Sequence, residues 1–500
     1  MKTIIELIED KCREQPNEIA IIEKKHQLTY AELYSGICEY SNILIQKGLQ
    51  KHDIVMVVSD DSTDIIIKNL AVMKAGGIFL LVDEDIPEER FRFIYNDAKP
   101  RFILSTNKFE KRELIKLSKG ESLECIDYEE CISGKCQIDD EEYLLDAAYI
   151  LYTSGTTGEP KGVIISNTSL MVFRNAIDCV VEYSKKDIVF LACTSMTFDI
   201  SILETIVTLS YGATCALVNK KMKLIPRLIP EYMAEAKVNA VQFTPTFFSF
   251  LWENIEEGKK CFSFIDKILI GGEIFRPNFF EELRKYTKAD IYNCYGPTEA
   301  TIWATVSKIT ESNNINLGIP LPGYEIEIDY SLQQEYGEIC ILGDAVANGY
   351  LRRKELTLSR FAINENGKKL YKTGDLGTYD KQGNLIYGGR NDRQVKLNGF
   401  RIELDEIEQC IEKVFDMINR AIVIKTKRSG KECLYCYYSS KETLNNSEIF
   451  AELEKHLPSY MLPKLFIHIK EIPKMINGKI DYQRLELENL DEKDSNYNRC

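Results

Sequence analysis

The chain has 500 residues, of which 63 are Lys or Arg and 77 are Asp or Glu, so its formal net charge is −14. Hydrophobic residues make up 44% of it, which is enough for a substantial core and excludes disorder for the bulk of the chain. The negative charge argues against nucleic-acid binding, because neutralising phosphates requires clustered Lys and Arg. No apolar run reaches the roughly 18 residues of a membrane helix, and the N-terminus turns acidic at Glu6 before a signal-like stretch develops. We therefore expect a cytoplasmic protein.

The cysteines also favour a cytoplasmic protein. There are 15 of them, an odd number in a long chain with no secretion signal, which favours free thiols in a reducing compartment. Cys433 and Cys436 have CxxC spacing, but no second such pair accompanies them and the chain has four His in all. We interpret this pair as buried strand cysteines rather than zinc ligands.

Helical and strand patterns alternate along the first 270 residues, which is typical of an α/β fold. The predicted helices cover 64–76 and 201–209, and the predicted strands cover 78–82, 148–151, 187–192, 239–243 and 267–270. The turn-rich, charged stretch 383–398 is the best candidate for a linker. After it, a helix over 403–414 and strands over 421–425 and 434–438 predict a small α+β domain, and we place the domains at 1–391 and 392–500.

One loop has the composition of a phosphate-binding site. Residues 152–162 follow an apolar strand and contain four hydroxyl side chains, three glycines and Lys161. Free backbone amides, hydroxyls and a cation suit a polyphosphate, although a solvated turn would have a similar composition. The spacing does not match GxxxxGK[ST], which argues against a Walker-type loop.

This loop and many further motifs, in order, resemble the adenylate-forming superfamily, which includes acyl-CoA ligases, luciferases and the adenylation domains of nonribosomal peptide synthetases. The motifs are Leu28–Leu33, Met73–Gly77, Phe198–Ser201, Asn293–Glu299, Gly337-Glu338, Asn348–Tyr350, Tyr371–Leu376, Gly389–Lys396, Gly399–Glu403, Leu457–Pro463 and Asn477–Asp481. The resemblance implies a large, multi-layered N-terminal adenylation domain that binds ATP and substrate, and a small, mobile C-terminal lid. The motifs at Asp199 and at the C-terminal end are similar to the amino-acid-activating members in particular.

The resemblance assigns most of these motifs to the nucleotide. The expected contacts are Thr153, Ser154, Gly155, Thr156, Thr157, Gly158, Lys161, Gly272, Asn293, Tyr295, Gly296, Thr298, Asp375 and Arg390. Asp375 would accept hydrogen bonds from both ribose hydroxyls, Arg390 would be a second ribose contact, and Tyr295 would stack on adenine. Tyr295 could equally be a core aromatic, and Gly374-Asp375 an ordinary turn.

Two residues would act on the reacting charges. As carboxylate attacks the α-phosphate, negative charge accumulates, so catalysis needs cations and positioning. Lys479 matches the family's bridging lysine, and Glu299 would help to hold Mg²⁺. Taken alone, Lys479 could be a surface lysine in a turn and Glu299 an ordinary residue at the start of a helix.

Asp199 would pair with the α-ammonium of an amino acid, although it could instead cap the helix near Ser201. The family's remaining pocket positions fall on Ile200, Leu203, Gln242, Leu269, Gly271, Cys294, Ile302 and Trp303. This set resembles the pocket of glycine-activating domains, with Cys294 as the one departure. We expect glycine as the substrate, and alanine next.

Family members then transfer the acyl group to a phosphopantetheine thiol while the lid rotates, and Asp392 matches the hinge position. No Gly-Gly-x-Ser motif follows, so we expect a separate carrier protein as acceptor. Three alternatives stay open: an acyl- or aryl-CoA ligase, a D-alanine ligase of cell-wall modification, and a non-catalytic partner with a degenerate site. Asp199 and the Asn477-Gly478-Lys479 motif argue against the first, the pocket residues against the second, and intact Lys479, Asp375 and Glu299 against the third.

Overall fold

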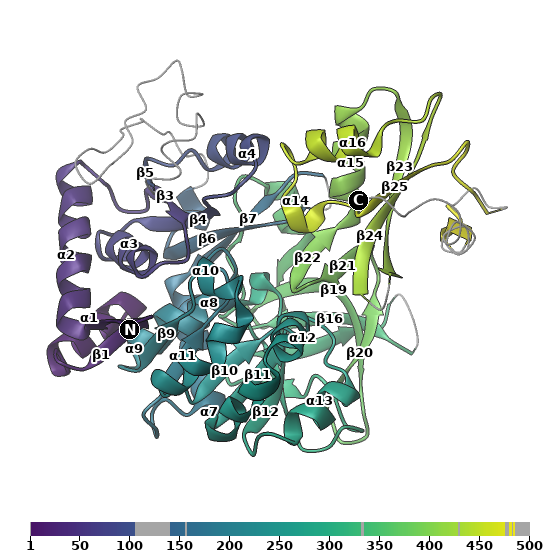
Figure 1. Ribbon diagram of the computed structural model, residues 1–500. Helices are drawn as coiled ribbons and strands as arrows, with labels where there is room; N and C mark the ends of the chain where they lie inside the picture. The colour runs from purple at the N-terminus through teal and green to yellow at the C-terminus, as the bar shows by residue number, and fades with distance from the viewer. Residues whose placement is uncertain are drawn as a thin grey trace. The chain divides into compact units, whose positions relative to one another are not determined.

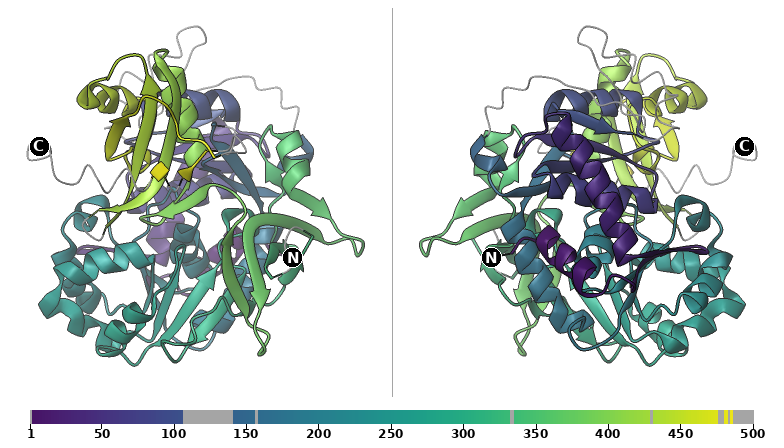
Figure 2. Two further views of the ribbon diagram at one scale, coloured as in Figure 1. Left: turned by 90° about the vertical axis from the view of Figure 1, so that its right-hand side faces the viewer. Right: turned by 90° about the vertical axis from the view of Figure 1, so that its left-hand side faces the viewer.

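The computed structural model describes residues 2–105, 141–155, 158–331, 335–428, 431–475, 480–482, 484 and 485. The chain forms two compact units, shown in Figures 1 and 2. The first comprises Met1–Asp85, Ile94–Thr153 and Lys161–Asp392, and the second comprises Ile86–Phe93, Ser154–Pro160 and Arg393–Cys500. None of the described helices is long and apolar enough to cross a bilayer.

A nine-stranded, mostly parallel sheet forms the centre of the first unit. Its order is β14 (Ile319–Pro320), β13 (Thr305–Ile309), β12 (Asp290–Tyr295), β11 (Lys267–Gly271), β10 (Ala240–Phe243), β8 (Val189–Ala192), β9 (Thr214–Leu217), β1 (Ile19–Glu23) and β2 (His26–Thr29). Strands β10, β11 and β12 lie side by side in Figure 1 and pair in parallel, with Gln242 opposite Leu269 and Gly271 opposite Cys294.

Two more sheets complete the first unit. The six-stranded sheet runs β17 (Gly349–Tyr350), β7 (Lys161–Ser166), β6 (Ala147–Thr153), β4 (Ile78–Asp83), β3 (Ile54–Ser59) and β5 (Phe102–Leu104). The third runs β15 (Glu325–Asp329), β16 (Gly337–Leu342), β19 (Lys369–Tyr379) and β18 (Phe361–Ile363), with β20 (Leu385–Arg390) beside β19. Its strands are the long green arrows of Figure 2. The multi-layered α/β architecture predicted from the sequence is confirmed.

The helices of this unit begin at local signals that the sequence carries. Helix α2 (Tyr30–Gln46) follows Thr29, which forms a reciprocal capping box with Glu32. Helix α12 (Pro245–Asn254) starts with a proline after Thr244, whose side chain accepts a hydrogen bond from the Phe247 N–H. The other main helices are α1 (Ile4–Glu14), α3 (Thr63–Lys74), α7 (Asn167–Val181), α10 (Lys220–Lys223), α11 (Ile229–Glu235), α13 (Pro277–Arg284) and α14 (Lys354–Arg360).

Two segments differ in detail from the sequence predictions. The helix expected over 201–209 is present, but its middle is π-helical: α8 (Ile200–Ile202) passes into a π-helical turn, η2 (Leu203–Val207), and then α9 (Thr208–Ser210). Buried threonine hydroxyls compete for its backbone carbonyls, with Thr205 bonding Ser201 O and Thr208 bonding Leu203 O. The stretch 383–398, expected to be a linker, contains the boundary between the two units at Asp392 and Arg393, but most of it forms β20 and β21 (Gln394–Leu397) on either side of a short bend.

The second unit has its own core. Strand β21 pairs with β22 (Phe400–Glu403), and a three-stranded sheet contains β23 (Ile418–Arg428), β24 (Lys431–Ser440) and β25 (Leu465–His468). Helices α15 (Leu404–Val414) and α16 (Asn446–Leu453) bury Ile407, Ile411, Ile449 and Leu453 in this core. Cys433 and Cys436 are buried free thiols on β24, and no metal-binding group of His, Cys, Asp or Glu occurs among the described residues. The strand interpretation of this pair is confirmed.

Candidate active site

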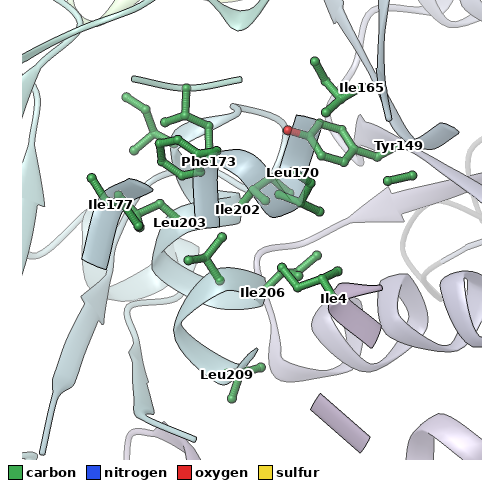
Figure 3. Packing of buried hydrophobic residues seen from close by; sticks show 14 of the residues in the cluster. Ile4, Tyr149, Ile165, Leu170, Phe173, Ile177, Ile202, Leu203, Ile206 and Leu209 are labelled. Atoms are coloured by element: carbon green, nitrogen blue, oxygen red, sulfur yellow. The ribbon is translucent and has the colours of Figure 1, made fainter. Parts of the chain in front are cut away.

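The predicted pocket residues share one face of the nine-stranded sheet. Leu269 and Cys294 join the same core cluster as Leu203 and Trp303, whereas Ile268 and Ile270 belong to the cluster on the opposite face. Figure 3 shows Leu203 in the first cluster, beside Ile202, Ile206 and Leu209 of the same helical segment. Strand alternation therefore brings the pocket positions on β10, β11 and β12 together.

Trp303 fills this pocket from a strained turn. Its N–H donates to Thr301 O at 3.1 Å across the single residue Ile302, which makes a γ-turn. Thr301 and Ile302 have φ of +57° and +74°, in the left-handed region that β-branched residues avoid. The Thr301 hydroxyl donates to Ala345 O at 2.7 Å and helps to hold the turn. Strain of this kind is characteristic of functional sites.

The indole is fixed on two sides. Trp303 Nε1 donates to Gln242 Oε1 at 2.9 Å, and both side chains are buried. A Cβ on Gly271 would lie 2.6 Å from Trp303 Cη2 and 2.6 Å from Cys294 O, so only glycine permits the indole to lie against this strand. The two large side chains thus occupy buried space beside Gly271.

Asp199 lies directly before α8. One carboxylate oxygen accepts from the Ile200 N–H at 2.8 Å, and the other accepts from the Thr298 hydroxyl at 2.7 Å. The capping alternative is therefore seen in the structure, but it does not exclude ligand binding because the side chain is only half-buried. Thr298, expected at the nucleotide, instead contacts the residue expected to bind the substrate ammonium.

Glu299 and Lys161 form a buried ion pair. Lys161 Nζ lies 3.5 Å from Glu299 Oε1, and the Tyr350 hydroxyl donates to the same oxygen at 2.8 Å. The ammonium also lies 4.7 Å from the centre of the Tyr350 ring. Sequence reasoning included Tyr350 in a motif but gave it no role, because nothing in the local pattern shows that β17 lies next to β7.

A second charged cluster surrounds Asp375. The Tyr295 hydroxyl donates to one carboxylate oxygen at 2.8 Å, and Arg390 Nη1 donates to the other at 2.5 Å. Arg390 also binds Asp392 through two hydrogen bonds of 2.7 Å. Burial raises the pKa of Tyr295 well above its usual value, and the Asp375 charge raises it further. Tyr295 is thus a buried aromatic residue whose hydroxyl holds the Asp375 carboxylate.

The other predicted nucleotide residues divide as follows. Thr153 has a buried hydroxyl with no hydrogen-bond partner within the described ranges, and Asn293 donates to Asn316 O at 2.7 Å. Gly272 has a φ of +83°, and a Cβ on Gly296 would lie 2.4 Å from Ile302 O, so both positions require glycine.

The rest of the predicted phosphate loop lies in the second unit, or outside the residues that can be described. The Ser154 hydroxyl donates to Arg401 O at 2.8 Å, and the Gly155 N–H donates to Glu406 Oε2 at 3.0 Å. A Cβ on Gly158 would meet the side chain of Gln409. Thr156, Thr157 and Lys479 lie outside the described residues.

Comparison with known proteins identifies the family of this chain. The family model for AMP-binding enzymes matches residues 8–351. The chain is 32% identical to bacitracin synthase 2 of Bacillus licheniformis over 97% of its own length but 18% of that protein, so it spans less than a fifth of that relative. It is 30% identical to zwittermicin A synthase ZmaJ of Bacillus cereus, covering 97% of this chain and 95% of ZmaJ.

Solved structures show the same fold. Holo-AB3403, a four-domain nonribosomal peptide synthetase bound to AMP and glycine, has a TM-score of 0.68 and 28% identity over 97% of this chain and 36% of its own. PA1221, which contains adenylation and carrier domains, has a TM-score of 0.81 and 23% identity over 97% of this chain and 84% of its own. The chain belongs to the AMP-binding enzyme family. Within it, the chain is an adenylate-forming ligase of the type found in nonribosomal peptide synthetases.

Proposed function

We propose that this enzyme activates a small amino acid, glycine, as its adenylate with release of pyrophosphate, and then transfers it to the phosphopantetheine thiol of a separate carrier protein. The observation that carries the proposal is the buried contact between Trp303 and Gln242 over Gly271, which takes up space that a larger substrate side chain would need. The glycine-bound relative supports the same choice. The need for ATP and the free thiols support a cytoplasmic setting.

Asp199 supplies the recognition of the α-ammonium in this proposal. Thr298 holds one of its oxygens and the Ile200 N–H the other, so the carboxylate is oriented before the amino acid arrives. An acid without an amine would form no ion pair with this carboxylate, which disfavours fatty and aryl acids.

The charge that develops on the α-phosphate calls for cations. Lys161 lies beside Glu299, and Lys479 is proposed to bridge the substrate carboxylate and the nucleotide. A magnesium ion brought with ATP would neutralise phosphate charge. No group of three or more His, Cys, Asp or Glu that could hold a metal occurs in the described part of the chain, so Glu299 would supply a carboxylate and phosphate oxygens and water would complete the coordination. We propose Asp375 and Arg390 as the ribose contacts and Asp392 as the hinge.

Amino-acid-dependent exchange of labelled pyrophosphate into ATP tests this proposal. Glycine, both alanine enantiomers, the larger amino acids and several acids without an amine should be compared, with Asp199→Asn as the key variant. We expect exchange with glycine above all and its loss in Asp199→Asn. Strong exchange with a large amino acid would overturn the glycine assignment, and exchange only with acids lacking an amine would overturn the role of Asp199.

Alanine is the second candidate, because it differs from glycine by one methyl group and a pocket discriminates weakly at that level. D-Alanine in the same assay separates a cell-wall-type ligase from the glycine enzyme. Formation of an acyl-CoA would reveal a CoA ligase.

A further inference from the structure

A short loop delivers Asp199 to the pocket. Residues 193–198 leave the end of β8 and lead directly to Asp199, so the position of this loop determines where the carboxylate lies. The backbone amides of Cys193, Thr194 and Met196 do not pair with a strand. Two carboxylates from elsewhere in the chain accept from them instead.

The first carboxylate is Glu204, on the π-helical turn η2. It is completely buried, and its Oε2 accepts from the Cys193 and Thr194 amides, both at 2.9 Å. Its Oε1 accepts from the Thr194 hydroxyl at 2.6 Å. Glu204 follows the pocket residue Leu203, so one π-helical turn supplies a pocket wall and an anchor for the loop.

The second carboxylate is Asp61, in the loop after β3. It is 2% exposed and has a left-handed φ of +58°. Its Oδ1 accepts from the Met196 amide at 2.8 Å, and its Oδ2 pairs with Lys223 Nζ at 2.9 Å. Lys223 also lies close enough to Glu204 to act on its charge. One ammonium therefore serves both carboxylates.

Burying two carboxylates costs more free energy than a loop would need if it only connected β8 to α8. A buried carboxylate loses several kcal/mol of hydration unless hydrogen bonds and a counter-charge replace it. Here two carboxylates are buried against a six-residue loop, and one of them, Asp61, lies on a left-handed backbone. The gain is a rigid loop, which suits a residue that must meet an ammonium in a defined position.

We propose that Glu204 and Asp61, with Lys223, are positioning residues that hold Asp199 in place for the substrate ammonium. The inference rests on the proposed role of Asp199. Removing either carboxylate would leave buried amides unpaired and let the loop shift, so recognition of the ammonium should weaken while nucleotide binding should not.

A pair of matched ligands tests this. Glycyl sulfamoyl adenosine carries the ammonium, and acetyl sulfamoyl adenosine differs by lacking the amine. Calorimetry of both should be run on wild type, Glu204→Leu, Asp61→Gly, and the conservative Glu204→Gln and Asp61→Asn. Gly and Asn both accept the left-handed backbone at 61, so this pair isolates the side-chain acceptor. Asp290→Asn, at the far end of β12 in the pair with Lys267, is the control for loss of a partly buried ion pair.

We expect Glu204→Leu and Asp61→Gly to bind the glycyl ligand about tenfold or more weakly, with less than about twofold change for the acetyl ligand. Glu204→Gln can keep every hydrogen bond and Asp61→Asn keeps the Met196 bond, so both should recover most of the affinity. Equal losses for both ligands in folded variants, or no loss for either, would overturn the inference. If Glu204→Leu unfolds, Asp61→Gly decides. Wild type that does not distinguish the ligands would instead refute the role of Asp199.

Discussion

Trp303 and Gln242 are 61 residues apart in sequence, yet the indole N–H of one donates to the amide oxygen of the other at 2.9 Å in a buried pocket. Trp303 is the last residue of a γ-turn that begins at Thr301, and Gln242 lies in the middle of β10. The contact therefore combines a strained loop with a rigid strand, and both determine how much room a substrate side chain has.

Trp303→Ala should enlarge the pocket and change the substrate range. We expect exchange with glycine to fall by about tenfold or more, because packing around the small substrate is lost, and exchange with larger amino acids to appear. Trp303→Phe keeps a ring but loses the donor to Gln242, so its effect should be smaller. The other tryptophan, Trp252, packs in the opposite core cluster, and Trp252→Phe is the control. An unchanged substrate range in Trp303→Ala would contradict this view of the pocket.

Gly271→Ala should be disabling. The added methyl would approach a ring carbon of Trp303 and the backbone oxygen of Cys294, both at 2.6 Å, and the backbone cannot move aside without disturbing β12. We expect a loss of stability of about 1–3 kcal/mol and the loss of most exchange activity. Gly383→Ala, with a positive φ but open space around its Cβ, is the matched control and should lose stability only. Full activity in Gly271→Ala would mean that Trp303 lies elsewhere.

Glu299→Gln should remove the negative charge from the buried ion pair with Lys161. Lys161 is 4% exposed and would keep its ammonium without the opposing carboxylate, which costs about 3 kcal/mol or more. We expect lower resistance to urea together with loss of exchange at any Mg²⁺ concentration. Tyr350→Phe keeps the ion pair and removes the bond to Glu299 at 2.8 Å and the longer one to the Tyr371 hydroxyl at 3.4 Å, so it should lose only about 1–2 kcal/mol. Wild-type stability in Glu299→Gln would show that the pair is not formed in solution.

Glu204 should make stability depend on pH. Burial raises its pKa from about 4.5 to about 7, so the folded state binds a proton that the unfolded state has released over this interval. Its stabilising contribution is complete below about pH 4.5 and is lost as pH rises through 7, up to about 3 kcal/mol. Glu204→Gln mimics the protonated form. In urea unfolding, wild type should therefore lose stability relative to this variant between pH 5 and pH 8, and a constant difference would contradict the prediction.

Much of the fold follows from local patterns. The run from Asp64 to Lys74 forms α3, and the apolar run after Gly77 forms β4, because periodicity and glycine stops act within a few residues. The π-helical turn at Leu203 could not be predicted in this way, because its threonine hydroxyls bond backbone carbonyls and Glu204 binds the loop that precedes the helix. A helical pattern alone does not report such competition.

The candidate site was likewise predictable only in part. Motif resemblance identified Asp199, Glu299 and Asp375, but their partners come from elsewhere in the fold: Thr298 for Asp199, Tyr350 for Glu299, and Tyr295 for Asp375. These pairings are decided by which strands become neighbours, and nothing in the separate motifs encodes that. Nothing in the sequence indicated a role for Asp61, because it lies in an ordinary polar turn.

The alternation of side chains along β11 has an evolutionary consequence. Deleting one residue from this strand would replace Leu269 and Gly271 on the pocket face by their neighbours Ile268 and Ile270, and would drive a branched side chain into the indole. Lineages of such enzymes can therefore change their substrate by exchanging residues within the strands. Gains and losses of length are therefore expected in the connecting loops, where they leave the strand register unchanged.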